Sequence, residues 1–267
     1  MKTEQAKDLI EKQIEALGSA LESGRSEQLQ EFLATMARFH RYSLGNVLLI
    51  MAQRPEATQV AGFHAWKSFG RFVKAGEKGI AILAPMSLKR ERHDASDSSP
   101  PADEDRVLRF RVAYVFDVSQ TDGEPLPEFA KTSGDPGEYS LRLKSLVRQM
   151  NIELDYSDKL GGALGVSKGG AILLQSGLDP AQEFTTLVHE LAHEILHHGT
   201  GREGSTKRSR ELEAEAVAFV VAQSIGLDTG TASSDYIQLY TGDKKLLTER
   251  LDAVRRTAAT ILDGLTA

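Results

Sequence analysis

Apolar side chains recur at helical spacing through the first fifty residues of the chain. Stripes at residues 9–21 and 29–39 have apolar positions three or four apart, which predicts two amphipathic helices. Ser43 is a good helix cap, so a short third helix is expected to follow it. The first stripe consists of Leu9, Ile10, Ile14, Leu17 and Leu21, and the second of Leu29, Phe32, Leu33, Met36 and Phe39.

From Val60 onward the helical stripes give way to short apolar runs separated by glycine. The run GIAILAP, which ends at Pro85, and the run at residues 107–118, rich in Val, Phe and Tyr, predict two strands. Between them, residues 88–106 are polar and rich in Ser, Pro and Asp, which predicts a flexible loop.

A cluster of glycine and proline at residues 119–138 indicates a domain boundary. We therefore expect one domain over residues 1–130 and a second over residues 138–267. The elements expected in the second domain are a helix at 139–150, strands at 152–156, 163–167 and 171–175, and then helices. The glycines between the last two strands predict a hairpin. The expected fold class is α+β, with a helical and β module first and a small sheet in the second domain.

Composition and charge limit which kinds of metal site and binding partner are possible. The 267 residues include no cysteine, which excludes disulfides, thiol nucleophiles and cysteine-based metal sites, so His, Asp and Glu must hold any metal. The net charge of −6 argues against a protein that coats nucleic acid through its bulk charge. The charged N-terminus is unlike a signal peptide, and no apolar run approaches the roughly 18 residues of a membrane span. We expect a cytoplasmic protein without a membrane partner.

The strongest chemical signal is HELAH at residues 189–193, which fits the HExxH pattern. It lies in a predicted helix that begins with a good N-cap residue, Asp179. Because residues four apart lie above one another on a helix, His189 and His193 can bind one metal ion. Zinc lowers the pKa of a bound water to about 7, so the adjacent Glu190 can act as general base in hydrolysis. The competing interpretation is an ordinary pair of surface histidines.

A catalytic zinc needs a third protein ligand. The acidic stretch RELEAEAVAF at residues 210–219 offers three carboxylates on one predicted helix, although such runs are usually solvated faces. Glu211 and Glu215 share a face of it, whereas Glu213 is expected to point elsewhere. We favour Glu211 as the ligand, with Glu215 as the alternative ligand or as a residue that orients a histidine. His197 is a further alternative, although packing near the end of its helix is the simpler interpretation.

These residues resemble a known family. The stretch FTTLVHELAH at residues 184–193, followed by ELEAEAVA at residues 211–218, is similar to the ImmA/IrrE metallopeptidases, whose pattern is roughly FTxxHExxH and then ExxANxFA. Glu215 and Val217 stand where that family often has Asn and Phe. These departures affect the packing around the site more than its ligands.

The resemblance implies a zincin-like metallopeptidase domain with an active-site helix. In that family the two histidines and the first glutamate of the second motif bind zinc, which corresponds to His189, His193 and Glu211 here. The glutamate of the first motif, Glu190, is the general base. The predicted strand at residues 171–175 is a candidate to pair with an extended peptide substrate.

A second feature is a basic and aromatic segment between Arg38 and Lys78, with seven Lys or Arg against two Glu. Basic side chains that follow phosphates, with aromatic rings that stack on bases, are typical of single-stranded DNA binding. The candidate DNA-binding residues, chosen by charge and position, are Arg41, Lys67, Arg71, Lys74 and Lys78. The competing interpretation places Trp66 and the phenylalanines in a core and the basic residues on a solvated rim.

This segment is similar to the N-terminal domain of ArdC-type antirestriction proteins. The similarity rests on YSLGN at 42–46, QRPEAT at 53–58, GFHAW at 62–66, GRFVKAGEKGI at 70–80 and VFDVSQT at 115–121. In that family this domain binds single-stranded DNA, and a metallopeptidase-like domain follows it. The resemblance extends over residues 30–267, apart from the loop at 88–106.

The two resemblances together imply a protein of the antirestriction or mobile-element type. It would bind single-stranded DNA and use zinc to hydrolyse peptide bonds in an unknown protein substrate or a restriction enzyme. The alternative is a protein that binds DNA or a restriction enzyme without catalysis, and whose metal site is structural or residual. A peptidase without DNA affinity is a third, weaker hypothesis.

Overall fold

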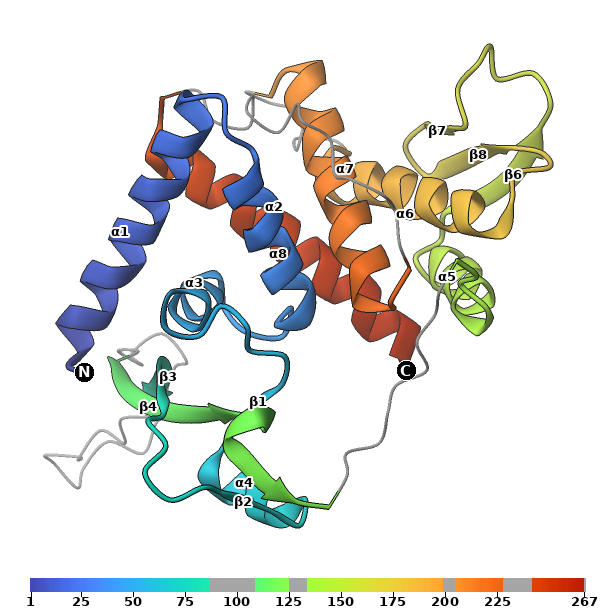
Figure 1. The fold of residues 1–267 in the computed structure, drawn as a ribbon. Coiled ribbons are helices and arrows are strands. Elements are labelled where there is room, and N and C mark those ends of the chain that lie inside the picture. The colour runs from blue at the N-terminus through green and yellow to red at the C-terminus, as the bar shows by residue number, and fades with distance from the viewer. Residues whose placement is uncertain (87–108, 125–133, 199–204, 228–241, 267) are drawn as a thin grey trace, which may run out of the picture. The chain divides into compact units, whose positions relative to one another are not determined.

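The computed structural model describes residues 1–86, 109–124, 134–198, 205–227 and 242–266 (Figure 1). By packing, the chain divides into two units, Met1–Glu11 with Leu48–Glu124, and Lys12–Val47 with Pro125–Ala267. Residues 12–47, which the sequence analysis places in the first domain, thus pack with the second unit. The domain division near residue 130 stays a prediction. The predicted loop at residues 88–106 lies outside the described residues.

Three helices open the chain, as the apolar stripes predict. They are α1 (Thr3–Glu22), α2 (Glu27–Arg38) and α3 (Leu44–Gln53). The second stripe supplies buried side chains of α2, among them Leu29, Phe32 and Leu33. The hydroxyl of Ser43 accepts a hydrogen bond from the N–H of Asn46 at 3.4 Å, so Ser43 occupies the predicted cap position of α3.

The first unit contains two small antiparallel sheets. The strand order is β1 (Val60–Gly62), β4 (Arg109–Asp117), β3 (Ile80–Met86) in one sheet, and β2 (Arg71–Val73) with β5 (Thr121–Gly123) in the other. A short helix, α4 (Phe63–Ser68), connects β1 to β2. The two predicted strands correspond to β3 and β4. The other strands and α4 were not predicted, because elements of three to six residues are too short to show a periodic pattern.

Side chains that bond to the backbone hold these short elements together. The buried Trp66 donates a hydrogen bond from Nε1 to the carbonyl of Phe116 at 2.8 Å. The carboxylate of Asp117 accepts hydrogen bonds from the backbone N–H groups of Thr58 and Gln59 at 2.8 and 3.1 Å. Trp66 is therefore a core residue, as the competing interpretation of the aromatic segment states for it.

The second unit contains one mixed three-stranded sheet. β8 (Ala171–Gln175) lies in the middle, parallel to β6 (Glu153–Ser157) and antiparallel to β7 (Gly165–Ser167). Gly169 and Gly170 have φ values of 77° and 91°, as a two-residue hairpin turn with positive φ at both positions requires. The predicted hairpin is therefore confirmed. All three predicted strands are present, with ends within two residues of those expected.

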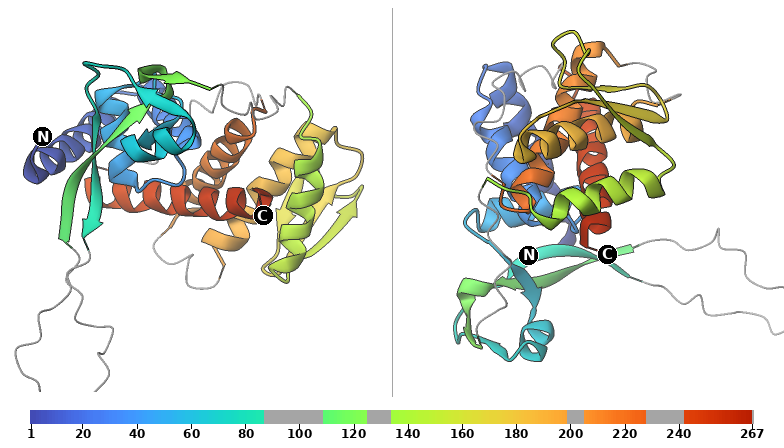
Figure 2. Two further views of the ribbon diagram at one scale, coloured as in Figure 1. Left: turned by 90° about the horizontal axis from the view of Figure 1, so that it is seen from below. Right: turned by 90° about the vertical axis from the view of Figure 1, so that its right-hand side faces the viewer.

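Four helices complete the second unit (Figures 1 and 2). They are α5 (Glu138–Gln149), α6 (Pro180–Leu196), α7 (Lys207–Ser224) and α8 (Lys244–Thr266). α6 packs against β7 and β8 as well as against α7, and α8 contacts α5, α6 and α7. Their facing side chains are apolar and buried, for example Leu187 and Leu191 of α6 and Val217 of α7.

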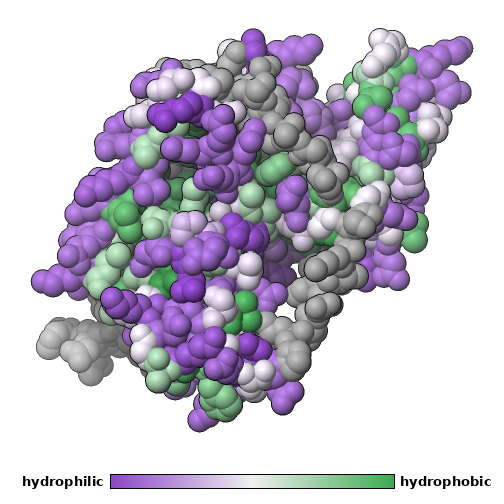
Figure 3. Space-filling view, viewed as in Figure 1, coloured by the Kyte–Doolittle hydropathy of each residue, from purple (hydrophilic) through white to green (hydrophobic). Residues whose placement is uncertain are grey.

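One face of the molecule is mainly polar (Figure 3). In the face seen in Figure 3, hydrophilic side chains predominate and hydrophobic ones form small groups between them. None of the described helices is long and apolar enough to cross a membrane.

Candidate metal centre

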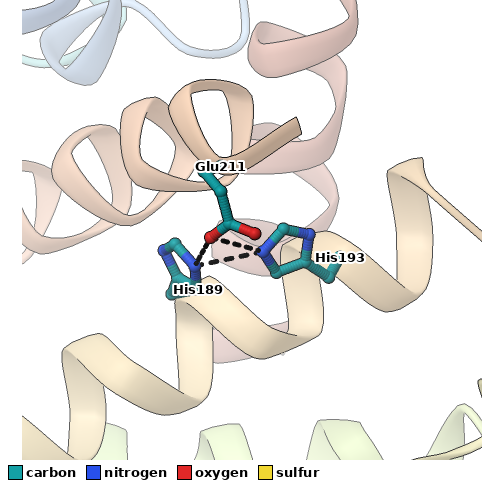
Figure 4. A group of neighbouring side chains, drawn as sticks. All are labelled: His189, His193 and Glu211. Atoms are coloured by element: carbon teal, nitrogen blue, oxygen red, sulfur yellow. Dashed lines mark hydrogen bonds and ion pairs between the residues drawn. The ribbon is translucent and has the colours of Figure 1, made fainter. Parts of the chain in front are cut away.

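α6 holds the HExxH residues in a fixed orientation. The carboxylate of Asp179 accepts a hydrogen bond from the N–H of Gln182 at 3.0 Å, and a proline follows as the first helical residue. Because the apolar face of α6 is buried, the helix cannot rotate about its axis without exposing it. His189 and His193 therefore project on the same side, and Glu211 of α7 points between them (Figure 4).

The ligand atoms of these three side chains form a small triangle. The Nε2 atoms of His189 and His193 are 3.1 Å apart, and each lies 3.5 Å from Oε2 of Glu211. Two ligands at about 2.1 Å from one tetrahedral metal ion are about 3.4 Å from each other. The triangle thus has the size that a single divalent ion requires. Within the described residues it is the only group of three or more potential metal-binding side chains so arranged.

Burial keeps the two imidazoles in the form that binds metal. Loss of contact with water lowers the pKa of His189 and of His193, and the adjacent imidazole helps to lower the pKa of His193 to about 4. The negative charge of Glu211 opposes this shift without reversing it. Both rings are therefore neutral near pH 7, with a nitrogen lone pair available to an ion.

Glu190 follows His189 on α6 and has little contact with water. The residue is 7% exposed, and burial raises the pKa of its carboxyl to about 7, although a hydrogen bond from the backbone N–H of Ser167 acts in the opposite direction. The negative charges of Glu211 and Glu194 raise the pKa further. A carboxyl with a pKa near 7 can accept and return a proton at neutral pH, as a general base does.

β7 approaches Glu190 so closely that only glycine fits at position 165. A Cβ atom at Gly165 would lie 2.7 Å from Cγ of Glu190 and 2.8 Å from Cγ2 of Thr186. Gly165→Ala is therefore expected to displace β7 or Glu190 and to lower the free energy of unfolding by about 1–3 kcal/mol. Urea denaturation measures the loss. Gly62→Ala is the control, because a Cβ there meets no atom within 4 Å. Equal losses in the two variants would contradict the close packing.

Two family models match the chain. The N-terminal domain of anti-restriction factor ArdC matches residues 3–116, and the IrrE N-terminal-like domain matches residues 142–234. The chain has the domain architecture of ArdC-type antirestriction proteins. Both resemblances seen in the sequence are thereby confirmed, as is the α+β fold class. The second match includes all three residues of the triangle, which places them in a metallopeptidase-like domain.

Similar proteins agree with this ArdC-type architecture. Two crystal structures of the antirestriction protein ArdC from the R388 plasmid, one metal-free and one with Mn(II) bound, have TM-scores of 0.57 and 0.55. They are 17% and 16% identical over 97% and 96% of this chain, and 98% of each is covered, so the likeness is one of fold. An uncharacterized protein of Bacillus anthracis is 26% identical over 96% of this chain, which spans about half (50%) of that protein's length.

Outside the triangle, the glutamate of α7 that contacts a histidine is Glu213, whereas Glu215 was the expected residue. Glu213, which was expected to point elsewhere, accepts a hydrogen bond from Nε2 of the buried His197 at 2.8 Å. Nδ1 of His197 in turn lies 3.0 Å from Nδ1 of His193. His197 and Glu215, the two alternative ligands, are both outside the triangle among the described residues. His197 instead contacts the ring nitrogen of His193 that points away from the triangle.

Another glutamate that the sequence analysis missed fixes the β7–β8 turn. The carboxylate of Glu194 accepts hydrogen bonds from Oγ of Ser167 at 2.6 Å and from the N–H groups of Gly169 and Gly170 at 2.8 and 2.6 Å. Burial alone would raise the pKa of Glu194, but these three donors lower it, so the carboxylate is ionised at neutral pH. The contact holds β7 against α6.

Two of the five candidate DNA-binding residues serve the structure of the ArdC N-terminal domain itself. Arg71 donates hydrogen bonds to backbone carbonyls of β5, and its Nε donates to the hydroxyl of Thr121 at 2.8 Å. Nζ of Lys74 donates to the carbonyl of Ser119 at 3.1 Å. The sequence shows that these residues are basic, but it does not show whether a basic side chain bonds to the backbone or faces solvent.

The other three candidates are divided between the two units. Arg41 belongs to the second unit, where it pairs with Asp263 at 3.4 Å. Lys67 and Lys78 are exposed, and neither forms an ion pair with another described residue. Lys67 lies on α4, and three phenylalanines within five residues of it in the sequence are more than half exposed, which the sequence did not distinguish from core residues. These are Phe63, Phe69 and Phe72, with exposures of 53%, 57% and 60%.

Proposed function

We propose that this chain binds single-stranded DNA and hydrolyses peptide bonds with a metal ion in the service of antirestriction. The observation that carries the proposal is the triangle of His189, His193 and Glu211 next to the buried Glu190. Two imidazoles and a carboxylate, with a second carboxylate as base, form the set that hydrolytic zinc sites use. The substrate would be an unknown protein, with a restriction enzyme as the first candidate.

Zinc is the ion that we assign to this site. Imidazole ligands suit zinc, and sites of nitrogen and oxygen ligands generally bind it more tightly than manganese. The Mn(II) in one crystal structure of ArdC from the R388 plasmid makes manganese the alternative to test. The experiment is elemental analysis of protein purified without added metal, followed by titration of the metal-free protein with each ion. A preference for manganese would contradict the zinc assignment, and absence of binding would contradict the site.

A zinc ion held there would lower the pKa of a bound water to about 7. The chain's own residues supply the remaining requirements. The neutral rings of His189 and His193, together with Glu211, hold the ion, and Glu190 accepts a proton and returns it to the leaving amine. The backbone of β7 covers one side of Glu190, as the short Gly165 contacts indicate, and limits its access to water.

The strand proposed to pair with an extended peptide is β7. The strand expected from the sequence to do this, residues 171–175, is β8, which is hydrogen-bonded to β6 on one side and to β7 on the other, so that expectation is wrong. β7 is an edge strand of this sheet, and its Gly165 lies against Glu190. A peptide added to the edge of β7 would bring its backbone close to the proposed base.

Single-stranded DNA is proposed to bind at α4 and the residues that follow it. Several large aromatic side chains that are more than half exposed in one short segment can mark an interaction site. Phe63, Phe69 and Phe72 have that exposure, and the exposed Lys67 lies between the first two in sequence. Aromatic rings stack on unpaired bases, and a nearby ammonium group pairs with phosphate, which is how sequence-independent single-strand binding works.

Phe72→Ala is expected to weaken binding to an oligothymidine strand about 5- to 150-fold, because stacking one base on an aromatic ring contributes about 1–3 kcal/mol. Fluorescence anisotropy at about 50 and 200 mM salt measures it, and Lys67→Gln should reduce the salt dependence. The control is Leu141→Ala, an apolar position in the second unit that is even more exposed than Phe72. Unchanged binding in both Phe69→Ala and Phe72→Ala would contradict this surface. A wild-type protein without DNA affinity would favour the peptidase-only hypothesis.

A further inference from the structure

We propose that His197, Glu213 and Arg250 position His193 for metal binding through a directed chain of hydrogen bonds. The proposal rests on the proposed metal site and gives a role to three residues outside the triangle. They come from different elements: His197 is the residue that caps the C-terminus of α6, Glu213 lies on α7, and Arg250 lies on α8. Each of the three helices around the site would thus contribute to the orientation of one ligand.

The contacts are continuous from the candidate ligand to α8. Nε2 of His193 faces the triangle, and Nδ1 of the same ring lies 3.0 Å from Nδ1 of His197. Nε2 of His197 lies 2.8 Å from Oε2 of Glu213, and Oε1 of that carboxylate lies 3.3 Å from Nε of Arg250. His197 and Glu213 are buried, and the side chain of Arg250 is 10% exposed, so water competes little for these contacts.

The chemistry of the atoms gives the chain a direction. A carboxylate only accepts hydrogen bonds, so the hydrogen between His197 and Glu213 belongs to Nε2 of His197. The other nitrogen of a neutral imidazole is an acceptor, so Nδ1 of His197 accepts the hydrogen carried by Nδ1 of His193. His193 then has its hydrogen on Nδ1 and a lone pair on Nε2, where the triangle lies. This is the tautomer that a metal ligand bound through Nε2 requires.

Arg250 contributes by holding the last acceptor in place. Its guanidinium contacts Oε1 of Glu213, which leaves Oε2 directed at His197. Burial of a carboxylate without a cation would lower the stability of the fold, and the guanidinium of Arg250 on α8 offsets that loss. Metal-binding histidines usually donate their second nitrogen to a carboxylate or carbonyl, which fixes the orientation of the ring. Here a second imidazole lies between the ligand and the carboxylate.

The test measures zinc affinity and the tautomer of His193 in wild-type protein and in three variants. Affinity is obtained by competition with a chelator, and the tautomer by long-range proton–nitrogen correlation on protein with labelled histidines. We expect wild-type His193 to bind zinc through Nε2 and to carry hydrogen on Nδ1. His197→Leu removes the acceptor and should weaken zinc binding about 10- to 100-fold, with a changed Nδ1–H signal.

Two further variants show whether the hydrogen bonds themselves matter. His197→Gln keeps an amide oxygen to accept from His193 and an amide N–H to donate to Glu213, so it should restore most of the affinity lost in His197→Leu. His198→Gln is the matched control, because His198 is the exposed neighbour on the same segment and should leave affinity unchanged. Thermal unfolding of the metal-free variants separates loss of positioning from loss of fold.

The outcomes distinguish this proposal from the one on which it rests. Wild-type protein that binds neither zinc nor manganese would overturn the proposed metal site. Zinc binding with the same affinity and the same His193 signal in His197→Leu would overturn the chain alone. If His197→Leu does not fold, the wild-type spectrum still decides, because His193 bound through Nδ1 contradicts the direction of the chain.

Discussion

Glu190→Gln is expected to reduce peptide hydrolysis by a factor of about 10²–10⁴ while the protein keeps its metal. Glutamine matches glutamate in shape but does not accept a proton in the same way, so the variant removes the proposed base and leaves all three candidate ligands. Hydrolysis is measured on a fluorescent protein substrate in the presence of single-stranded DNA, and metal content on the same sample. Glu183→Gln on the same helix is the control. Undiminished cleavage by Glu190→Gln would rule out the mechanism.

The pH profile of the same reaction provides a second readout for Glu190. In the metal-free protein its pKa is about 7, so the carboxyl is protonated, and inactive as a base, at lower pH. The positive charge of a bound ion lowers the pKa of a nearby carboxyl. We therefore expect kcat/KM to fall as the pH drops through a value at or below 7. A profile that stays flat down to pH 4.5 would show that Glu190 is not the base.

The same variant separates catalysis from binding alone. Antirestriction is measured as the survival of unmodified plasmid DNA in a restricting host. If hydrolysis is the means of protection, Glu190→Gln should protect no better than an empty vector, although it still binds DNA. Full protection by this variant would instead favour the alternative, in which the metal site is structural or residual and the protein acts by binding.

The sequence alone predicts those site residues that share a helix better than those that come from different helices. The HExxH residues lie within two turns of α6, so the helical period brings them together without knowledge of the fold. Glu211 lies on another helix and shares a face of it with Glu215, so the helical period does not separate the two, whereas the family pattern favours Glu211. The contacts of His197 with Glu213 and of Glu213 with Arg250 depend on how α6, α7 and α8 cross, which no local pattern specifies.

In the ArdC N-terminal domain, the residues that carry the family resemblance mostly hold the fold together. The side chain of Gln53 both donates to the carbonyl of Ala81 and accepts from its N–H, at 2.9 and 3.0 Å. Trp66, Arg71 and Asp117 also bond to the backbone. The motif therefore predicts the fold of this domain better than it predicts a DNA surface. The surface that we propose rests instead on exposed phenylalanines, and exposure depends on tertiary packing that composition does not reveal.

His189→Ala is expected to remove metal binding. Structural zinc sites with four ligands bind with about 10–16 kcal/mol, so one ligand contributes about 3 kcal/mol, a factor of about 100 or more. In wild-type protein, zinc at 100 times its Kd should raise the free energy of unfolding by about 2.7 kcal/mol. The variant should show no such rise in Tm at the same zinc concentration, and elemental analysis after dialysis should find it empty.

The control for this prediction is His64→Ala, which removes an exposed histidine from the first unit and should leave metal content unchanged. His189 is not part of the contacts between His193, His197 and Glu213, so the metal-free variant should unfold at nearly the wild-type temperature. A loss of metal can then be attributed to the missing ligand rather than to a damaged fold. Retention of metal by His189→Ala would mean that Glu215 or His197 completes the site, and would contradict the triangle as the ligand set.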